Sequence, residues 1–262
     1  MATPTRYPQG ISNAYPWQFF ANMGIPNPFY YHSFSDDFDT APVVATGWTP
    51  SGTGTAPPGS PADGGTVVLT TTAVAAEFES LERTLATFQP AAGKKTYFVT
   101  RIALSDVTNS AMIAGLFPTA STTPFTPPAN GIWVSKASGT LQLVLNVANN
   151  SVVTSTNFPA PAAIGFTLTN AVAFDIGIHV TAGANGNAAT VNASVAPNLV
   201  GFGPQSGTGT AGSTNRAPNI VSTAPLLTTL QATVLAPLVG VQAGTTTIKT
   251  MTVDFVGAFR ER

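Results

Sequence analysis

The sequence Val172-Ala173-Phe174-Asp175-Ile176-Gly177-Ile178-His179-Val180 alternates along its whole length. Every second side chain from Val172 to Val180 is apolar, and Ala, Asp, Gly and His stand between them. Successive side chains of a strand point to opposite faces of a sheet, so this alternation predicts a strand with one buried and one wetter face.

The same two-residue period recurs along most of the chain. It marks further strands at 65–72, 96–104, 111–117, 131–136, 141–147, 188–195 and 251–259. Clusters of Gly, Pro, Asn and Ser lie between these segments, and such clusters form turns. Many short strands with one wet face predict an all-β protein, an antiparallel β-sandwich of two sheets packed face to face.

Residues 73–88 depart from that period. Val74, Phe78, Leu81, Leu85 and Phe88 recur at helical spacing, and three glutamates fill the other side. The spacing favours a short helix, whereas the neighbouring segments favour another strand. Both interpretations stay open for this stretch.

Charge is distributed unevenly. Between residues 137 and 248 the only charged side chains are Asp175 and Arg216. Charged residues make up 8% of the chain, against about a quarter in a typical soluble domain. Because the buried cores of protein–protein interfaces are depleted of charge, we predict a protein that binds its neighbours and is not an enzyme.

Composition excludes several other classes of protein. The absence of Cys excludes disulfide scaffolds, thiolate zinc sites and cysteine catalysis. A net charge of −1 without a basic cluster argues against nucleic acid as a partner. Residues 1–10 lack the apolar core of a signal peptide, and Pro225 and Pro237 interrupt the uncharged run 224–244. We therefore expect neither a secretory signal nor a membrane partner.

The first 32 residues form a separate region, an extended N-terminal arm. They hold eight of the chain's 24 aromatic side chains and a single charge, Arg6. Aromatic anchors dominate interface energetics, so we expect the arm to lie over another surface. Its candidate binding residues are Tyr15, Trp17, Phe19, Phe20, Phe29, Tyr30 and Tyr31. Alternatively, the arm folds back over its own sandwich, which would span residues 33–262 with long loops at 49–65, 118–130 and 201–219.

Few residues could support catalysis. The chain has two histidines, His32 and His179. Asp175 shares a strand face with His179 but lies four residues away, roughly 13 Å along a strand. That separation is beyond hydrogen-bond reach, so we predict no catalytic residue and a solvated His179.

Two acidic clusters are candidates for a chemical site. Glu77, Glu79 and Glu82 only approximate the paired carboxylates of a sandwich glycosidase, because the middle Asp of that pattern is replaced. The second cluster comprises Asp36, Asp37 and Asp39, with Phe34 and Phe38 between and beside its members. It lacks the spacing of a calcium loop, and its alternative is a strand start with wet acids and buried Phe34 and Phe38. We predict no metal and no cofactor.

A series of short motifs spans nearly the whole chain. They are Pro26-Asn27-Pro28-Phe29-Tyr30-Tyr31-His32, Ser35-Asp36-Asp37-Phe38-Asp39, Gly47-Trp48, Gly64-Gly65, residues 95–108, Gly115-Leu116, Asn130-Gly131-Ile132-Trp133, Thr250-Met251-Thr252-Val253-Asp254-Phe255 and Glu261-Arg262. In this order they resemble a group of tailed-bacteriophage virion proteins with a concanavalin-A-like, jelly-roll sandwich, which decorate or cement the head shell.

The resemblance implies a role and a partner. It implies a homotrimer where capsomers meet, with arms that reach over the major capsid protein. The protein would lie on the outer surface of the virion after assembly in the bacterial host cytoplasm. Three arms binding at once would raise avidity, and binding only the expanded shell would stabilise that shell.

Two other functions stay open. One is a glycan-binding module or tail-fibre lectin, and the other is a structural protein of the tail or collar. Sandwich lectins bind sugars on exposed aromatic platforms or through calcium-ordered loops. Beyond the arm, only Trp48 and Trp133 could supply such a platform, and Trp133 alternates like a core residue.

Overall fold

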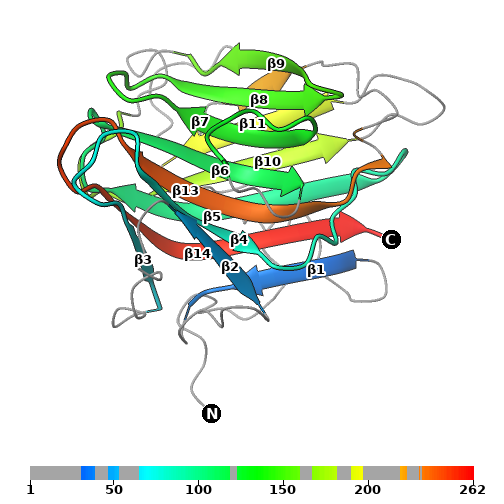
Figure 1. Cartoon of the computed structure of the whole chain (residues 1–262). Helices are drawn as coiled ribbons and strands as arrows, with labels where there is room; N and C mark the ends of the chain where they lie inside the picture. The colour runs from blue at the N-terminus through cyan, green and yellow to red at the C-terminus, as the bar shows by residue number, and fades with distance from the viewer. Residues whose placement is uncertain are drawn as a thin grey trace, which may run out of the picture.

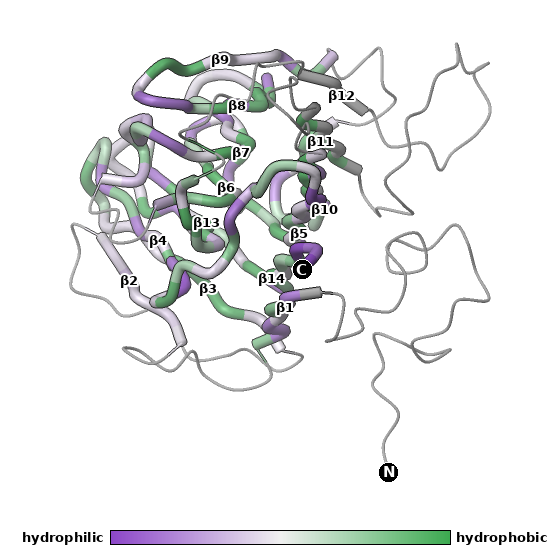
Figure 2. Tube along the Cα trace, turned by 90° about the vertical axis from the view of Figure 1, so that its right-hand side faces the viewer, coloured by the Kyte–Doolittle hydropathy of each residue, from purple (hydrophilic) through white to green (hydrophobic). Residues whose placement is uncertain are grey.

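The computed structural model describes residues 31–38, 47–52, 65–118, 123–159, 167–181, 190–196, 219–222, 230 and 232–262. Within these ranges the elements are strands, and every strand pair is antiparallel. The strands form two sheets that lie one behind the other in Figure 1 and side by side in the turned view of Figure 2.

The first sheet has the strand order β1-β14-β5-β10-β11-β12, and β3 also pairs with β14. Its strands are β1 (Tyr31–Asp36), β3 (Val67–Thr70), β5 (Lys95–Leu104), β10 (Phe174–Thr181), β11 (Thr190–Ala196), β12 (Asn219–Ser222) and β14 (Thr250–Glu261). The segment 172–180 thus lies in the middle of the sheet, as part of β10, between β5 and β11.

The second sheet has the order β2-β4-β13-β6-β7-β8-β9. Its strands are β2 (Trp48–Gly52), β4 (Phe78–Arg83), β6 (Ser110–Pro118), β7 (Gly131–Lys136), β8 (Leu143–Asn149), β9 (Val152–Asn157) and β13 (Leu235–Ala243). Strands β2 and β9 are its two edges, and β9 lies at the top of Figure 1.

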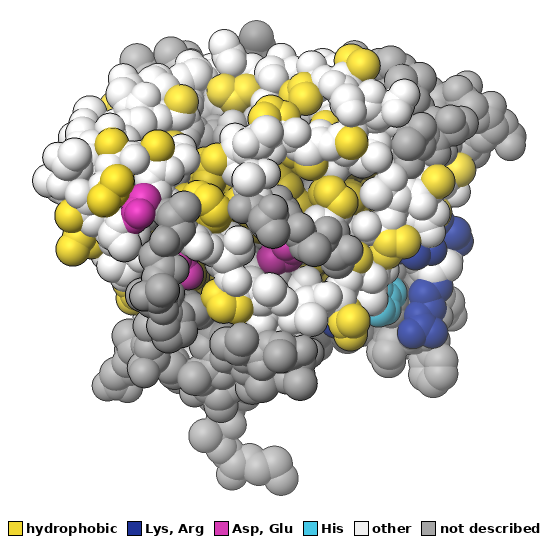
Figure 3. All heavy atoms as spheres, viewed as in Figure 1, with side chains coloured by type: hydrophobic (Ala, Val, Ile, Leu, Met, Phe, Trp, Pro, Cys, Tyr) yellow, Lys and Arg dark blue, Asp and Glu magenta, His cyan; other side chains and the backbone are white. Residues whose placement is uncertain are grey.

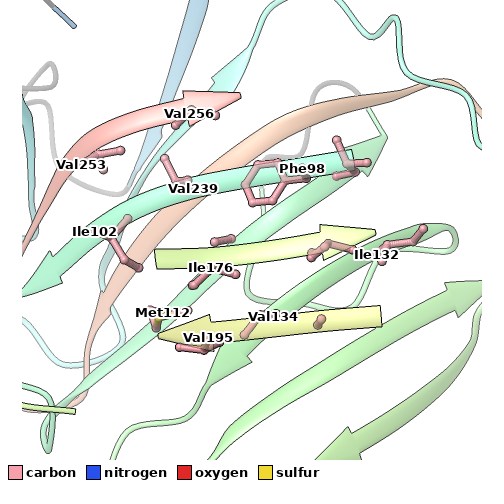
Figure 4. Packing of buried hydrophobic residues seen from close by; sticks show 14 of the residues in the cluster. Phe98, Ile102, Met112, Ile132, Val134, Ile176, Val195, Val239, Val253 and Val256 are labelled. Atoms are coloured by element: carbon pink, nitrogen blue, oxygen red, sulfur yellow. The ribbon is translucent and has the colours of Figure 1, made fainter. Parts of the chain in front are cut away.

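The hydrophobic core fills the space between the sheets. Phe98, Ile102, Ile176, Val195 and Val253 of the first sheet meet Met112, Ile132, Val134 and Val239 of the second (Figure 4). These residues occupy alternate positions of their strands. The two-residue period in the sequence therefore arises because one face of each strand is buried between the sheets. The all-β sandwich and the strands expected from that period are confirmed.

The ambiguous stretch 73–88 forms a strand and not a helix. Residues 78–83 are β4, which pairs with β2 on one side and β13 on the other. Val74 and Leu85, two members of the helical stripe, are 53% and 59% exposed. The members of the stripe therefore do not share one buried face, and strand pairing on both sides decides the conformation.

Four predicted boundaries change. Pro118, the first residue of the predicted loop 118–130, is the last residue of β6. β1 begins at Tyr31, inside the predicted arm, because Tyr31 pairs with Glu261 of β14. β2 runs to Gly52, so four residues of the predicted loop 49–65 are strand. Asn219, the last residue of the predicted loop 201–219, opens β12. Residues 123–130 of the loop 118–130 contain no named strand.

One carboxylate lies close to the lysines on both sides of the charge-poor segment 137–248. Asp106 accepts a 2.7 Å hydrogen bond from Lys249 Nζ, and its charge also acts on Lys136. Burial lowers the pKa of Lys136 to about 8, and the field of Asp106 opposes that shift. Lys136 and Lys249, the charged residues that flank this segment, are thus both buried near Asp106.

Candidate functional site

The edge strand β9 is exposed and uncharged. It pairs with β8 through one edge, and in the described part of the chain no strand pairs with its other edge. Four of its six side chains are exposed, including Val152 at 66%. Edge strands of soluble proteins usually carry charge, proline or a bulge that blocks pairing. The opposite edge, β2, contains Pro50, whereas β9 has neither proline nor charge.

A two-residue turn sets the register of β9. Asn150 and Ser151 have φ angles of 50° and 65°, and the strand pairs resume at once with Asn149 opposite Val152. Positive φ at both central residues is typical of the hairpin turns that match strand twist. β9 is therefore held in a defined position next to β8, with its free edge outward.

A neutral hydrogen-bond ladder crosses the outer face of β7, β8 and β9. Asn146 Nδ2 donates to Ser135 Oγ at 2.8 Å, and Ser155 Oγ donates to Asn146 Oδ1 at 2.7 Å. Asn146 is buried and Ser155 is exposed, so the ladder extends from a buried position to the solvent-exposed surface. Neutral amide and hydroxyl groups of this kind can give up these hydrogen bonds and form new ones with the polar surface of a binding partner. Their desolvation costs less than the desolvation of ions.

Beside the ladder lies a second apolar cluster on the outer face of the same sheet. It contains Ile113, Phe117, Trp133, Ala148 and Leu238, with Phe125 and Val153 packed against it. The rings of Phe117 and Trp133 are 5.3 Å apart. Phe125 also contacts Phe78, with 5.9 Å between ring centroids, so residues near 125 lie over this face.

The surface over the second sheet is largely neutral. Figure 3 shows mostly yellow and white atoms on this face, with a few Asp or Glu side chains at the left and near the centre and Lys and Arg at the lower right. A glycine keeps the centre of the face flat, because a Cβ at Gly115 would come within 2.6 Å of Trp133 Cβ. The face thus has a closely packed apolar cluster and few charged side chains.

The two tryptophans do not form sugar platforms. Trp48 is 1% exposed and donates from Nε1 to Asp36 Oδ2 at 2.7 Å. Trp133 is 5% exposed. Its position in the alternating pattern predicts a core residue. Trp133 is buried, but it lies on the outer face of the sheet, in the second apolar cluster.

The predicted solvation of His179 is wrong. Its ring stacks on Tyr97, with 4.4 Å between centroids and 5° between the planes. Burial, with a smaller effect of Lys95, lowers the pKa of His179 to about 4. Asp175 forms an ion pair with Arg101 at 3.0 Å, while His179 shares a hydrogen bond with Thr181.

The acidic clusters have structural contacts. Glu79 faces the interior with Leu81, and burial raises its pKa to about 7, whereas Glu82 faces outward. The glutamates therefore do not share one face. Asp36 accepts hydrogen bonds from Phe38 N and from a tryptophan. Phe38 is buried as expected, but the predicted strand start is wrong, because β1 ends at Asp36.

Some predictions concern other parts of the chain or the whole chain. Tyr15, Trp17, Phe19, Phe20, Phe29 and Tyr30 lie outside the described residues, as do Asp39 and the loop 201–218. Among the described residues, no group of three or more His, Asp or Glu is placed to hold a metal ion. In the same part of the chain, no helix is long and apolar enough to span a membrane.

Sequence reasoning missed the neutral ladder and the second apolar cluster. Ser135, Asn146 and Ser155 are ordinary polar positions in three separate strands, and only the register of β7, β8 and β9 aligns them. The apolar residues at outward positions, such as Trp133 and Leu238, were a usable signal. A strand that is apolar at successive positions has two buried faces.

Comparison with known proteins supports the fold. No protein-family model matches the chain, and no curated protein matches it. An endo-1,3-β-glucanase from Streptomyces sioyaensis is similar in structure, with 14% identity over 90% of this chain and 99% of that one, at a TM-score of 0.57. Peanut lectin has 9% identity over 88% and 97% of the two chains, at a TM-score of 0.56.

A phage protein is also similar in structure. It is the CBM2 module of the evolved Dit protein of Lactobacillus casei BL23 phage J-1, with 12% identity over 88% of this chain and 96% of that one, at a TM-score of 0.53. At such identities the likeness shows the fold alone. The fold is a lectin-like, concanavalin-A-like jelly-roll sandwich.

Proposed function

We propose that this chain is a non-enzymatic structural protein of a bacteriophage virion. In this proposal it decorates and stabilises the head by binding the major capsid protein, as a homotrimer on the outer surface of the shell. The observation that carries the proposal is the end of the sandwich formed by β8 and β9, here called the uncharged end. Among the described residues no strand pairs with the outer edge of β9, which has neither charge nor proline.

The physical argument concerns the cost of desolvation. Burying an ion against a partner is expensive, whereas neutral hydroxyl and amide groups lose little when they change partners. An open strand edge also offers a row of backbone donors and acceptors, which an extended segment of a partner can pair with. The uncharged end is therefore suited to a protein partner that adds a strand to β9.

The N-terminal arm would supply a second contact in this proposal. Its aromatic residues Trp17, Phe19 and Phe20 would anchor on the capsid protein, and β1 fixes where the arm joins the sandwich. A trimer presents three such arms, so weak contacts add up to a high avidity. The structural likeness to a module from a phage protein is consistent with a place in the virion.

The first experiment determines where the protein occurs. Virions are purified, and this polypeptide is quantified against the major capsid protein by mass spectrometry. Copies comparable to the capsid protein support decoration of the head. A handful of copies would instead indicate the tail or collar, and absence from virions would contradict the structural role.

A matched pair of variants then tests the β9 edge. Val152→Lys places a charge on β9, and Leu85→Lys places one on an equally exposed apolar site elsewhere; the two side chains are 66% and 59% exposed. We expect Val152→Lys to weaken binding to assembled shells at least about tenfold and Leu85→Lys to leave it unchanged. Equal effects would exclude β9 as the contact. Deletion of residues 1–30, which leaves β1 intact, tests the arm in the same assay.

Glycan binding is the second candidate function. The Ser135–Asn146–Ser155 ladder is the observation that favours it, because sugars are bound through such neutral donors and acceptors. The similar structures include peanut lectin and a carbohydrate-active enzyme, which supports this candidate as well. The burial of both tryptophans argues against an aromatic platform.

Binding to purified host cell-wall polysaccharide tests this candidate. If a sugar occupies the ladder, Ser155→Ala weakens binding several-fold, while Thr154→Ala, on the other face of the same strand, does not. Polysaccharide binding by the purified chain, with no binding to shells, would replace the decoration proposal.

A further inference from the structure

The other end of the sandwich gathers cations that the sequence separates. Arg83 ends β4, Lys94 and Lys95 stand where β5 begins, and Arg260 and Arg262 lie at the end of β14. These are five of the ten Lys and Arg residues of the chain. Figure 3 shows Lys and Arg side chains gathered at the lower right, next to a histidine.

The group has little acid to balance it. Among the described residues, the ion pairs of the sandwich involve Arg101 and Lys249, and neither belongs to this end. Glu261 is an acid at this corner, and its carboxylate accepts the backbone N–H of Lys95 at 3.0 Å. Lys94 Nζ donates to the backbone carbonyl of Arg262.

Inside this corner, three side chains approach one another from both sheets. His32 and Arg260 are opposite each other in the β1–β14 pair, with their side chains toward the interior side of the sheet. Arg83 comes from β4 on the facing sheet, with its guanidinium carbon 4.2 Å from the centroid of Phe34. The ring of His32 lies 5.1 Å from that of Phe88, and Arg83 is 5.8 Å from the same ring.

Two of these polar groups are buried without a partner. His32 Nε2 and Arg260 Nε both lack a hydrogen bond. Buried polar atoms in proteins almost always have a partner, and each exception needs an explanation. Burial, followed by the charges of Arg83, Arg260 and Arg262, lowers the pKa of His32. Positive charge is therefore concentrated around a neutral imidazole with an unused nitrogen.

We propose that His32, Arg83 and Arg260 form a binding site for an oxyanion, a carboxylate or phosphate group, between the two sheets at this end of the sandwich. Guanidinium groups match such anions with paired hydrogen bonds, and an anion between two of them would offset their repulsion. Arg262, Lys94 and Lys95 would attract the anion to the entrance. The anion is either free phosphate or an acidic side chain of a protein partner.

His32 provides a direct readout, since the chain has only two histidines. We would follow both imidazoles by NMR in the full chain while sodium phosphate replaces sodium chloride at constant pH and ionic strength. We expect a saturable shift of His32 with a dissociation constant on the order of 1 mM. The pKa of His32 should rise, because the anion offsets the cations that lower it. His179 should not respond.

Matched variants test the assignment. Arg260→Gln and Arg83→Gln should each weaken the phosphate response at least about tenfold, whereas Lys95→Gln removes one charge at the rim and should change it less than about threefold. In chloride buffer, Arg260→Gln should unfold at the same temperature as the unaltered chain or higher. An unchanged response in both arginine variants, or an equal response of His179, would overturn the proposal.

A final comparison distinguishes the two sources of the anion. A short polyglutamate peptide is titrated under the same conditions as phosphate. Tighter binding of the peptide, lost in Arg260→Gln, indicates an acidic segment of a protein partner. Tighter binding of phosphate indicates a free anion. Failure of both probes contradicts the site and leaves the proposed binding through β9 untouched.

Discussion

At the end of the sandwich built from β8 and β9, polar side chains satisfy one another without charge, as Ser135, Asn146 and Ser155 do. At the end built from β1, β4 and β14, cations gather without enough acids, as Arg83 and Arg260 do. Both ends belong to one fold and share one core. The difference indicates two kinds of contact, a neutral one that a strand or a sugar could join and an ionic one that needs an anion.

Asp106 belongs to neither end, but its ion pair with buried Lys249 makes its loss the largest expected effect. Asp106→Ala leaves Lys249 as a buried charge without its 2.7 Å partner and removes the field that supports protonated Lys136. We expect the free energy of unfolding to fall by about 3–5 kcal/mol. Urea denaturation at pH 7 measures this, with Asp37→Ala as the control. A loss below about 1 kcal/mol would show that the ion pair is dispensable.

The same residue predicts a response to acid. Hydrogen bonds from Lys249 and Asn109 hold the pKa of Asp106 well below its usual range. A carboxyl whose folded pKa is depressed stabilises the fold above its unfolded pKa of about 3.9, and this contribution is lost as the pH falls further. The stability of the Asp106→Ala variant should therefore depend less on pH below about 4.

Glu79 should make the stability of the fold depend on pH in the opposite direction. Burial raises its pKa to about 7 from 4.5. Between these values the unfolded chain releases the proton and the folded chain retains it, so stability falls as the pH rises through this window. Glu79→Gln should therefore gain about 1–3 kcal/mol at pH 8 and little at pH 4. Thermal unfolding at both pH values tests this, and Glu261→Gln serves as the control without such a gain.

Asn146 should have a smaller effect at the uncharged end. Asn146→Ala leaves the hydroxyls of Ser135 and Ser155 without their amide partner. We expect a loss of about 1–2 kcal/mol. Chemical denaturation compares this variant with Thr154→Ala, whose side chain is exposed on the same edge strand. Similar losses in the two variants would mean that the ladder does not stabilise this end.

The turn that positions β9 should give the smallest effect. Ser151 has a φ of 65°, a conformation that glycine adopts more easily. Ser151→Gly should raise the free energy of unfolding by about 0.5 kcal/mol and leave binding through β9 unchanged. A destabilised variant would show that the serine side chain matters more than the backbone conformation.

Much of the fold could be predicted because its signal is local. The alternation in 172–180 depends only on which face of one strand is buried, and the structure places its apolar members in the core. The helical spacing in 73–88 was misleading, because pairing of β4 with β2 and β13 is a long-range interaction that spacing does not encode. The same limit hid the burial of His179, which depends on Tyr97 in another strand.

The all-β sandwich and the scarcity of charge between residues 137 and 248 can be read from the chain alone, because side-chain alternation and residue composition are local properties. Only the tertiary structure decided that Lys136 and Lys249 meet at Asp106, and that His32, Arg83 and Arg260 gather at one corner. These residues lie in strands far apart in the sequence. Strand order and register bring them together, and neither follows from the local period of two.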